Sequence, residues 1–238
     1  MKFALLAAGT AMLSLSAQAT ALSFYFTQGP SGYGSGDGNT RTFTSDGITV
    51  TATAFSLTGP GNTLQTSQLG EWAGWGLGVC NRNEGMNCAS PDHQVSNENG
   101  ADFVLFQFSS SIGPASITIQ SYGGYDSDAT FFAGNLSNGN LTGDTLASLN
   151  SLGLGGAMSS NGNASTSPRT INISSSGDNA IFFGARAGGG DTTPDYFKIA
   201  GISSSTNFSQ SPTPEPATLG MMGASLIALG VFAKRFNK

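Results

Sequence analysis

Histidine, cysteine and charged side chains are all scarce in this sequence. Its 238 residues include one histidine and two cysteines, and only 10% are Asp, Glu, Lys or Arg. The single histidine, His93, could serve a Ser-His-Asp hydrolase only beside an activated serine, and the chain has no G-x-S-x-G segment. Two cysteines and one histidine are too few ligands for a zinc site. P-loop, metalloprotease and dinucleotide-binding motifs are also missing. The sequence therefore predicts a protein that is not an enzyme.

The chain is also poor in positive charge. It carries 14 Asp and Glu against 9 Lys and Arg, a formal net charge of −5. The acidic residues lie almost wholly between residues 22 and 213, whereas much of the positive charge lies at the two ends. An acidic body repels phosphate backbones. We therefore expect no nucleic-acid partner.

Glycine and short strand-like runs dominate the middle of the chain. There are 34 glycines, and Ser, Thr and Asn crowd the segments between runs of aromatic and β-branched residues, which is typical of turn-rich β proteins. The fold class predicted is all-β, an antiparallel β-sandwich with jelly-roll-like character. One short helix is expected within residues 146–154. The run 101–109 is apolar on both faces and predicts a central strand. The main strand-like runs are "LSFYFT", "ITVTATAFSL", "ADFVLFQFS", "ASITIQSY", "DATFFAG", "RTINIS", "AIFFGAR" and "DYFKIAGIS".

The two cysteines lie close together, in "CNRNEGMNC". An even, local pair in an exported protein is typical of a disulfide, and we expect Cys80 to be joined to Cys88. Such a small loop would stabilise the fold by roughly 2–3 kcal/mol in the chain-entropy model.

The N-terminus has the three parts of an export signal. Lys2 supplies positive charge, residues 3–15 are almost wholly apolar or small, and Ala17-Gln18-Ala19 and Ala19-Thr20-Ala21 offer cleavage sites in two registers. Residues 1–21 are therefore predicted to be a signal peptide, recognised by signal peptidase. The mature chain would begin at Thr20 or Leu22.

The C-terminus combines a proline-rich stalk, an apolar run and a basic end. Residues 217–233 carry no charge, and Lys234, Arg235 and Lys238 follow. A helix of that length spans roughly 25 Å, close to the hydrocarbon core of about 30 Å. The basic end would stay on the cytoplasmic side. We expect a β-sandwich domain at 22–208, a stalk at 209–216 and a transmembrane helix with its basic end at 217–238.

The order Pro214-Glu215-Pro216, apolar helix, basic end is similar to the PEP-CTERM sorting signal of Gram-negative bacteria. The resemblance implies recognition of Pro214, Glu215 and Pro216 by exosortase, retention by Lys234 and Arg235, and removal or exchange of the tail. It also implies an inner-membrane intermediate, then a place at the cell surface or in the extracellular matrix, and an association with exopolysaccharide and biofilm. A permanent single-span anchor is the alternative.

A second stretch, "WGLGVCN…PDHQVSNENGADFVLFQF" followed by "YDSDATFFAG", resembles a domain that recurs among PEP-CTERM proteins. The resemblance implies a shared architecture without an established activity. In many of those proteins an aspartate is expected where this chain has Ser96.

Asp126 and Asp128 stand two residues apart, immediately before a strand-like run. In an extended segment both carboxylates point the same way, and calcium takes hard oxygen ligands from loops of this kind. Both residues are candidate calcium ligands, or they make turn hydrogen bonds. Further oxygens could come from Asp37, Asn39, Asn97, Glu98 and Asp102.

Trp72 and Trp75 lie in a region with little strand periodicity. Aromatic faces stack on sugar rings, so one alternative function is a carbohydrate-binding module, with calcium in support. The two tryptophans could equally be packed in the core. A further alternative is an extracellular hydrolase that uses two carboxylates, which the sequence does not single out.

Overall fold

The computed structural model describes residues 21–175, 177–188 and 193–205. All of them belong to one compact unit, residues 20–207. The predicted signal peptide up to Thr20, the stalk, the sorting motif and the apolar tail lie outside the described residues. Within the described ranges, the protein contains no helix with the length and apolar character needed to cross a bilayer.

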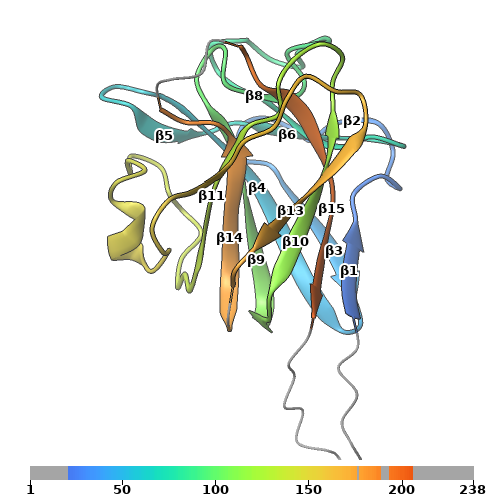
Figure 1. The fold of residues 1–238 in the computed structure, drawn as a ribbon. Coiled ribbons are helices and arrows are strands. Elements are labelled where there is room, and N and C mark those ends of the chain that lie inside the picture. Colours follow the sequence, from blue (N-terminus) through green and yellow to red (C-terminus); the bar gives the residue numbers. More distant parts are fainter. Residues whose placement is uncertain (1–20, 176, 189–192, 206–238) are drawn as a thin grey trace, which may run out of the picture. The chain divides into compact units, whose positions relative to one another are not determined.

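The described residues form two antiparallel β-sheets, which confirms the all-β prediction (Figure 1). The first is an eight-stranded sheet of β1 (Ala21–Tyr25), β2 (Gly32–Tyr33), β6 (Gln68–Trp72), β7 (Gly76–Cys80), β8 (Val95–Ser96), β10 (Ala115–Ser121), β13 (Pro168–Ile173) and β15 (Tyr196–Ser205). The second is a seven-stranded sheet of β3 (Thr40–Ser45), β4 (Ile48–Gly59), β5 (Thr63–Thr66), β9 (Asp102–Ile112), β11 (Ala129–Gly134), β12 (Met158–Ser160) and β14 (Asp178–Ala185).

Strand order places sequence-distant segments side by side. The first sheet runs β13-β10-β15-β7-β6-β2, with β1 and β8 also paired to β15. The second runs β12-β11-β14-β9-β4-β3, with β5 paired to β4. From β9 onward, the chain crosses repeatedly from one sheet to the other, for example through β13, β14 and β15.

Strands β3 and β4 are joined by a tight turn at Asp46-Gly47. Their register pairs Ser45 with Ile48, and the φ angles of Asp46 and Gly47 are 47° and 77°. Positive φ at both central residues is the type I′ geometry that matches the twist of a hairpin. The dipeptide Asp46-Gly47 is the sequence signal of such a hairpin, and the structure shows the hairpin.

Aromatic side chains fill the space between the two sheets. Phe24 of β1 lies 5.8 Å from Phe108 of β9, measured between ring centroids. Phe183 of β14 lies 6.0 Å from Phe197 of β15. Each pair joins one sheet to the other, and all four rings are buried. This packing makes the fold a β-sandwich.

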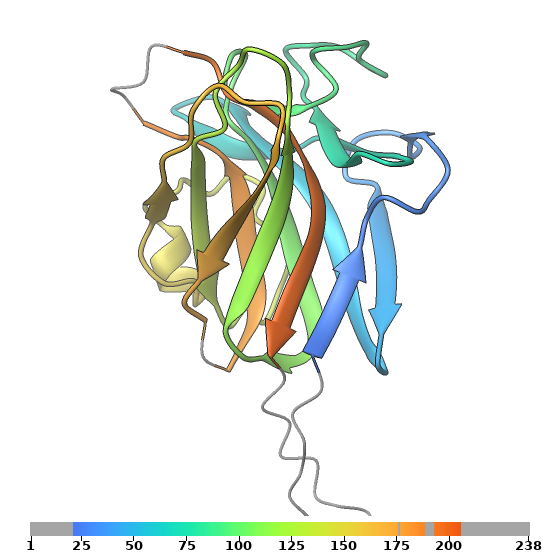
Figure 2. The same ribbon diagram turned by 45° about the vertical axis from the view of Figure 1, so that its right-hand side comes forward.

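A second hydrophobic cluster covers the opposite face of the second sheet. Phe103 of β9 stacks on Phe182 of β14 with ring centroids 4.6 Å apart. The segment 135–157 supplies leucines that cover this face, namely Leu136, Leu141, Leu149 and Leu154. The segment contains one 3₁₀ helix, η1 (Leu149–Leu152), within the range where a short helix was expected. It lies beside β11 and β14 in both ribbon views (Figures 1 and 2).

Strand β9 is therefore buried on both faces and lies between β14 and β4, which confirms the predicted central strand. Residues 58–100 are more regular than the sequence indicated. They contain β5, β6, β7 and β8, all of five residues or fewer.

The two ends of the described domain are neighbours. Ala21 at the start of β1 pairs with Ser205 at the end of β15, and Figure 2 shows these two strands side by side. Strand β15 begins at Tyr196 and ends at Ser205, so the loop before Tyr196 lies at the end of the sandwich opposite Ala21 and Ser205. The loops before β9 and β11 lie at the same far end (Figure 1).

The second cluster should contribute strongly to stability. Leu149 is fully buried, whereas Leu152, three residues along η1, is 39% exposed. We expect Leu149→Ala to lower the free energy of unfolding by about 2–5 kcal/mol, because it leaves a cavity. The matched control Leu152→Ala should change it by about 0.5 kcal/mol or less. Denaturant unfolding measures both, and equal effects would contradict this role of the segment 135–157.

Candidate functional site

The polar and aromatic side chains of interest gather near the end of the sandwich away from Ala21 and Ser205. They form three groups: a disulfide loop with a pair of neighbouring acids, a cluster of three aspartates, and a lysine enclosed by aromatic rings.

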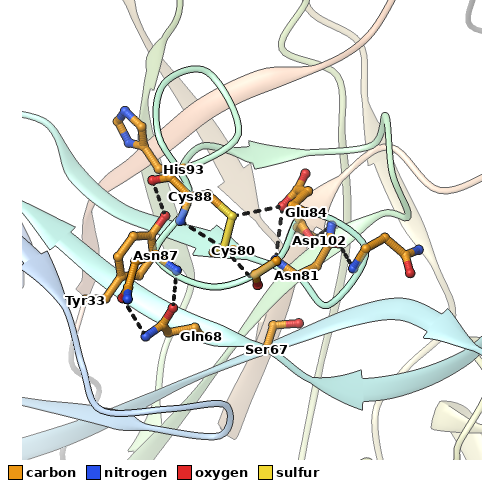
Figure 3. Close-up of a disulfide and its surroundings, with 12 residues drawn as sticks. Tyr33, Ser67, Gln68, Cys80, Asn81, Glu84, Asn87, Cys88, His93 and Asp102 are labelled. Carbon is orange, nitrogen blue, oxygen red and sulfur yellow. Dashed lines mark hydrogen bonds between the residues drawn. A yellow bond between two sulfur atoms is a disulfide. The ribbon is translucent and has the colours of Figure 1, made fainter.

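The disulfide loop closes the end of β7. Cys80 is bonded to Cys88, as predicted (Figure 3). Gln68 of β6 holds the loop through two hydrogen bonds: its Nε2 donates to Asn87 Oδ1 over 3.1 Å, and its Oε1 accepts from the Asn87 N–H over 3.0 Å. The Tyr33 hydroxyl donates to the Cys88 carbonyl over 3.2 Å. The loop is therefore fixed to strands β2 and β6.

Two carboxyl groups lie close together here: Glu84 belongs to the loop itself, and Asp102 lies at the start of β9 (Figure 3). Asp102 is fully buried. It accepts hydrogen bonds from Ser56 Oγ over 2.5 Å and from Asn81 Nδ2 over 3.1 Å. Ser96 Oγ lies 3.4 Å from Asp102 Oδ2 and 3.5 Å from Glu84 Oε1, so one hydroxyl bridges the two acids.

Burial decides the charge of this acid pair. Desolvation, followed by repulsion from Glu84, raises the pKa of Asp102 well above its ordinary value. Desolvation is also the largest cause that raises the pKa of Glu84. The pair consequently holds a proton at pH values where surface carboxyls are ionised.

The three aspartates come from two different sheets. Asp126 and Asp128 precede β11, and Asp195 precedes β15. One carboxylate oxygen from each lies within 4.8 Å of the others. Asp195 Oδ1 accepts from the Asp128 N–H over 2.7 Å, and its Oδ2 accepts from Asn97 Nδ2 over 2.6 Å. The bond from Asp128 to Asp195 ties the two sheets together at this end.

Arg186, just after β14, supplies a positive charge to the cluster. Its Nη1 lies 2.6 Å from Asp128 Oδ2 in an ion pair. The Gly162 N–H donates to the other oxygen of Asp128. Both oxygens of Asp128 therefore have protein partners, as do both oxygens of Asp195. A cation at this place would have to share these oxygens or displace Arg186.

The donor set itself suits calcium, because it consists of carboxylate oxygens. The structure adds Asp195 to Asp126 and Asp128. Asn97 lies against Asp195, whose N–H donates to Asn97 Oδ1 over 2.9 Å. The other candidates lie apart. Glu98 accepts from the Tyr196 hydroxyl, Asp37 pairs with Arg82 over 3.0 Å, Asn39 binds the backbone of Leu69, and Asp102 belongs to the acid pair. Calcium at Asp126 and Asp128 stays a prediction.

Lys198 of β15 is enclosed by aromatic groups. Its Nζ lies 3.5 Å from the centroid of the Trp72 ring, 2.7 Å from His93 Nδ1 and 2.6 Å from the His93 carbonyl oxygen. The His93 ring also packs on Trp72 at 4.6 Å. Burial lowers the pKa of Lys198 to about 6. Burial, followed by the Lys198 charge, lowers the pKa of His93 to about 4.

The two tryptophans have different surroundings. Trp72 is half-buried and already contacts Lys198, His93 and, at 5.1 Å, Tyr33. Trp75 lies in the turn between β6 and β7 and is 50% exposed. Trp75 offers an open ring for stacking, whereas Trp72 takes part in packing. Sugar contact by this pair stays a prediction.

No family model, no curated protein and no solved structure matches this chain.

Sequence reasoning missed Asp195, Glu84 and Lys198. The sequence did hold a signal for Asp195, namely an aspartate directly before an apolar strand. This pattern occurs in "GADFVLF", "DSDATFF" and "TPDYFKI". Asp102, Asp128 and Asp195 are all buried at those strand starts. No comparable local signal marks Lys198, because its partners His93 and Trp72 come from distant segments.

The raised pKa of Asp102 makes stability depend on pH. A carboxyl whose pKa is higher in the folded state contributes stability that is fully present below its unfolded pKa, about 3.9, and is lost as pH rises through the folded pKa. Asp102→Asn removes this titration. We expect the free energy of unfolding to fall less steeply between pH 5 and 9 in this variant than in the unaltered protein.

Denaturant unfolding across that pH range measures the two slopes. The pKa of Lys198 is lowered, so its titration makes the free energy of unfolding rise with pH, opposite to the effect of Asp102. This contribution is present in both proteins and cancels when their slopes are compared. Asp37→Asn, at the partly exposed pair with Arg82, is the matched control and should keep the original slope. Identical slopes in all three proteins would contradict a protonated Asp102.

The calcium prediction has its own test. A calcium ion bound only to the folded state would stabilise it by about 2.7 kcal/mol at a hundredfold excess over Kd. The thermal midpoint should then rise in millimolar calcium, and Asp195→Asn should abolish the rise. A midpoint unaffected by calcium would contradict the site and leave Arg186 as the charge partner of Asp128.

Proposed function

We propose that this chain is an exported, non-catalytic protein of the cell surface or extracellular matrix, associated with exopolysaccharide and processed by exosortase. The observation that carries the proposal is the Cys80–Cys88 disulfide. Disulfides persist in oxidising compartments and are rare in the cytosol of most organisms. The bond agrees with the predicted signal peptide at residues 1–21.

The position of the domain ends also supports the proposal. Because Ala21 and Ser205 are paired, a signal peptide and a tail would both attach to the same end of the sandwich. Cleavage after Ala19 would leave all of β1 in the mature protein, whereas cleavage after Ala21 would remove its first residue.

The same proposal includes a jelly-roll-like connectivity of the strands. The repeated crossing of the chain between the two sheets from β9 to β15 supports it, because jelly rolls place successive strands on opposite sheets. Such domains commonly serve as surface and binding modules, which suits a role without catalysis. Carbohydrate binding is the second candidate, favoured by the exposed ring of Trp75.

The proposal predicts the mass of the mature protein. The chain recovered from the cell surface or matrix should lack residues 1–19 or 1–21 and also the basic end that includes Lys238. In a host without exosortase, and in a Glu215→Gln variant, the uncleaved tail should keep the protein in the inner membrane. Thr213→Ala, beside the motif, is the matched control and should be processed normally.

Intact-mass spectrometry of each cell fraction checks these outcomes. A full-length chain with an intact Lys238 in the outer fractions would contradict exosortase processing. Free thiols at Cys80 and Cys88 in a cytosolic protein would contradict export itself.

A further inference from the structure

The outer face of the first sheet presents neutral hydrogen-bonding side chains in rows. The register pairs Ser23 with Ser203, Ser203 with Ser116, and Ser116 with Asn172, so one row crosses β1, β15, β10 and β13. The burial patterns of β1, β10 and β13 alternate and leave these residues partly or fully exposed, and Ser203 of β15 is exposed as well. Neighbouring strands lie about 4.8 Å apart, so the row is a regular array of donors and acceptors.

A second row runs parallel to the first. It consists of Tyr25, Gly201, Thr118 and Thr170, in register across the same four strands. Thr118 Oγ1 lies 3.3 Å from Thr170 Oγ1. Neither row contains Asp, Glu, Lys or Arg. In a chain with a formal net charge of −5, this face is neutral and carries hydroxyl and amide groups.

Tyr25 stands at the edge of a groove beside these rows. Its side chain is 62% exposed, although Phe24 and Phe26 on either side are buried. The groove has a volume of about 370 Å³, and its lining includes Tyr25, Phe43, Ser23, Gln28 and Glu71. A second hollow, of about 640 Å³, lies on the same face and is lined in part by Ser116, Asn172 and Ser203.

Glu71 gives the groove a fixed acceptor. It is only 3% exposed, and it is held by the Gly29 N–H over 2.8 Å and by Arg41 Nη1 over 3.2 Å. Each carboxylate oxygen can accept a further hydrogen bond. A Cβ on Gly29 would lie 2.3 Å from Glu71 Oε1, so glycine is required at this position for the carboxylate to approach the backbone.

We propose that this face binds an extended chain of an uncharged polysaccharide. Tyr25 stacks on one sugar ring at the groove, Glu71 and Gln28 hydrogen-bond its hydroxyls, and the two rows continue these contacts across the sheet. The inference deepens the proposed function by naming the chemical class of the partner and a site apart from Trp72 and Trp75.

Charge and polarity select this occupant. An acidic polymer would be repelled by the protein, whose charge balance is negative. A second copy of the chain is disfavoured, because stable protein interfaces have an apolar, aromatic centre, whereas the two rows contain Ser, Thr and Asn with one tyrosine at the edge. A neutral polymer with many hydroxyls matches both properties of the face.

Affinity electrophoresis of the purified full chain in detergent tests the site. The gels contain a neutral β-glucan, a galactomannan or dextran, and alginate serves as the acidic polymer. We expect retardation by at least one neutral polymer and none by alginate. Tyr25→Ala should weaken that binding by about tenfold or more, whereas Tyr25→Phe, which keeps the ring, should bind within about threefold of the unaltered chain.

Leu152→Ala is the matched control, because Leu152 is an exposed apolar residue outside the groove lining. It should bind like the unaltered chain, and thermal melting should show that all variants are folded. Trp75→Ala tests the other candidate ring. Loss of binding in Trp75→Ala with normal binding in Tyr25→Ala would overturn the site. Binding to alginate, or the absence of binding to every neutral polymer, would overturn the ligand class. Self-association of the protein that Tyr25→Ala abolishes would also overturn it, because the face would then bind a second copy of the chain. These outcomes concern purified protein, so they are independent of whether exosortase processes the tail.

Discussion

Burial of both faces of strand β9 is the constraint on which the rest of this fold depends. One face packs against the first sheet through Val104, Phe106 and Phe108, and the other packs beneath the segment 135–157 through Phe103 and Leu105. A strand without a polar face cannot lie at an edge or against solvent, because each large apolar side chain left in water costs about 1.5–3 kcal/mol. The chain must therefore build two hydrophobic layers around this strand. The second sheet, the leucine-bearing segment and η1 all follow from that need.

The far end of the sandwich is organised by hydrogen bonds rather than by many charges. Asp102, Asp128 and Asp195 are each buried at the start of a strand, and each carboxylate accepts donors from a neighbouring loop. A buried carboxylate without such partners would be strongly destabilising. The same groups that could serve a ligand therefore also hold the loops in place. Lys198 is a parallel case, because its buried amine is stabilised by the Trp72 ring and by His93.

The two proposals concern adjoining parts of the domain. The paired ends at Ala21 and Ser205 suit delivery and attachment, since both terminal extensions leave from one place. The neutral face of β1, β15, β10 and β13 suits a hydroxyl-rich partner. Both features use β1 and β15, because Ser23 and Ser203 of the first row lie two residues from Ala21 and Ser205.

Much of the fold could be read from the sequence, because strand alternation, type I′ turn residues and a strand apolar on both faces are local properties. Composition and spacing were enough for an all-β domain, for the Asp46-Gly47 hairpin and for the Cys80–Cys88 bond. Partners separated by long stretches of chain were decided only by tertiary structure. Asp195 joins Asp128 across 67 positions, and Lys198 joins His93 across 105. The row of Ser23, Ser203, Ser116 and Asn172 likewise exists only because the register of four strands places each residue beside the next. Periodicity records which way a side chain points, but only pairing between distant strands determines what lies next to it.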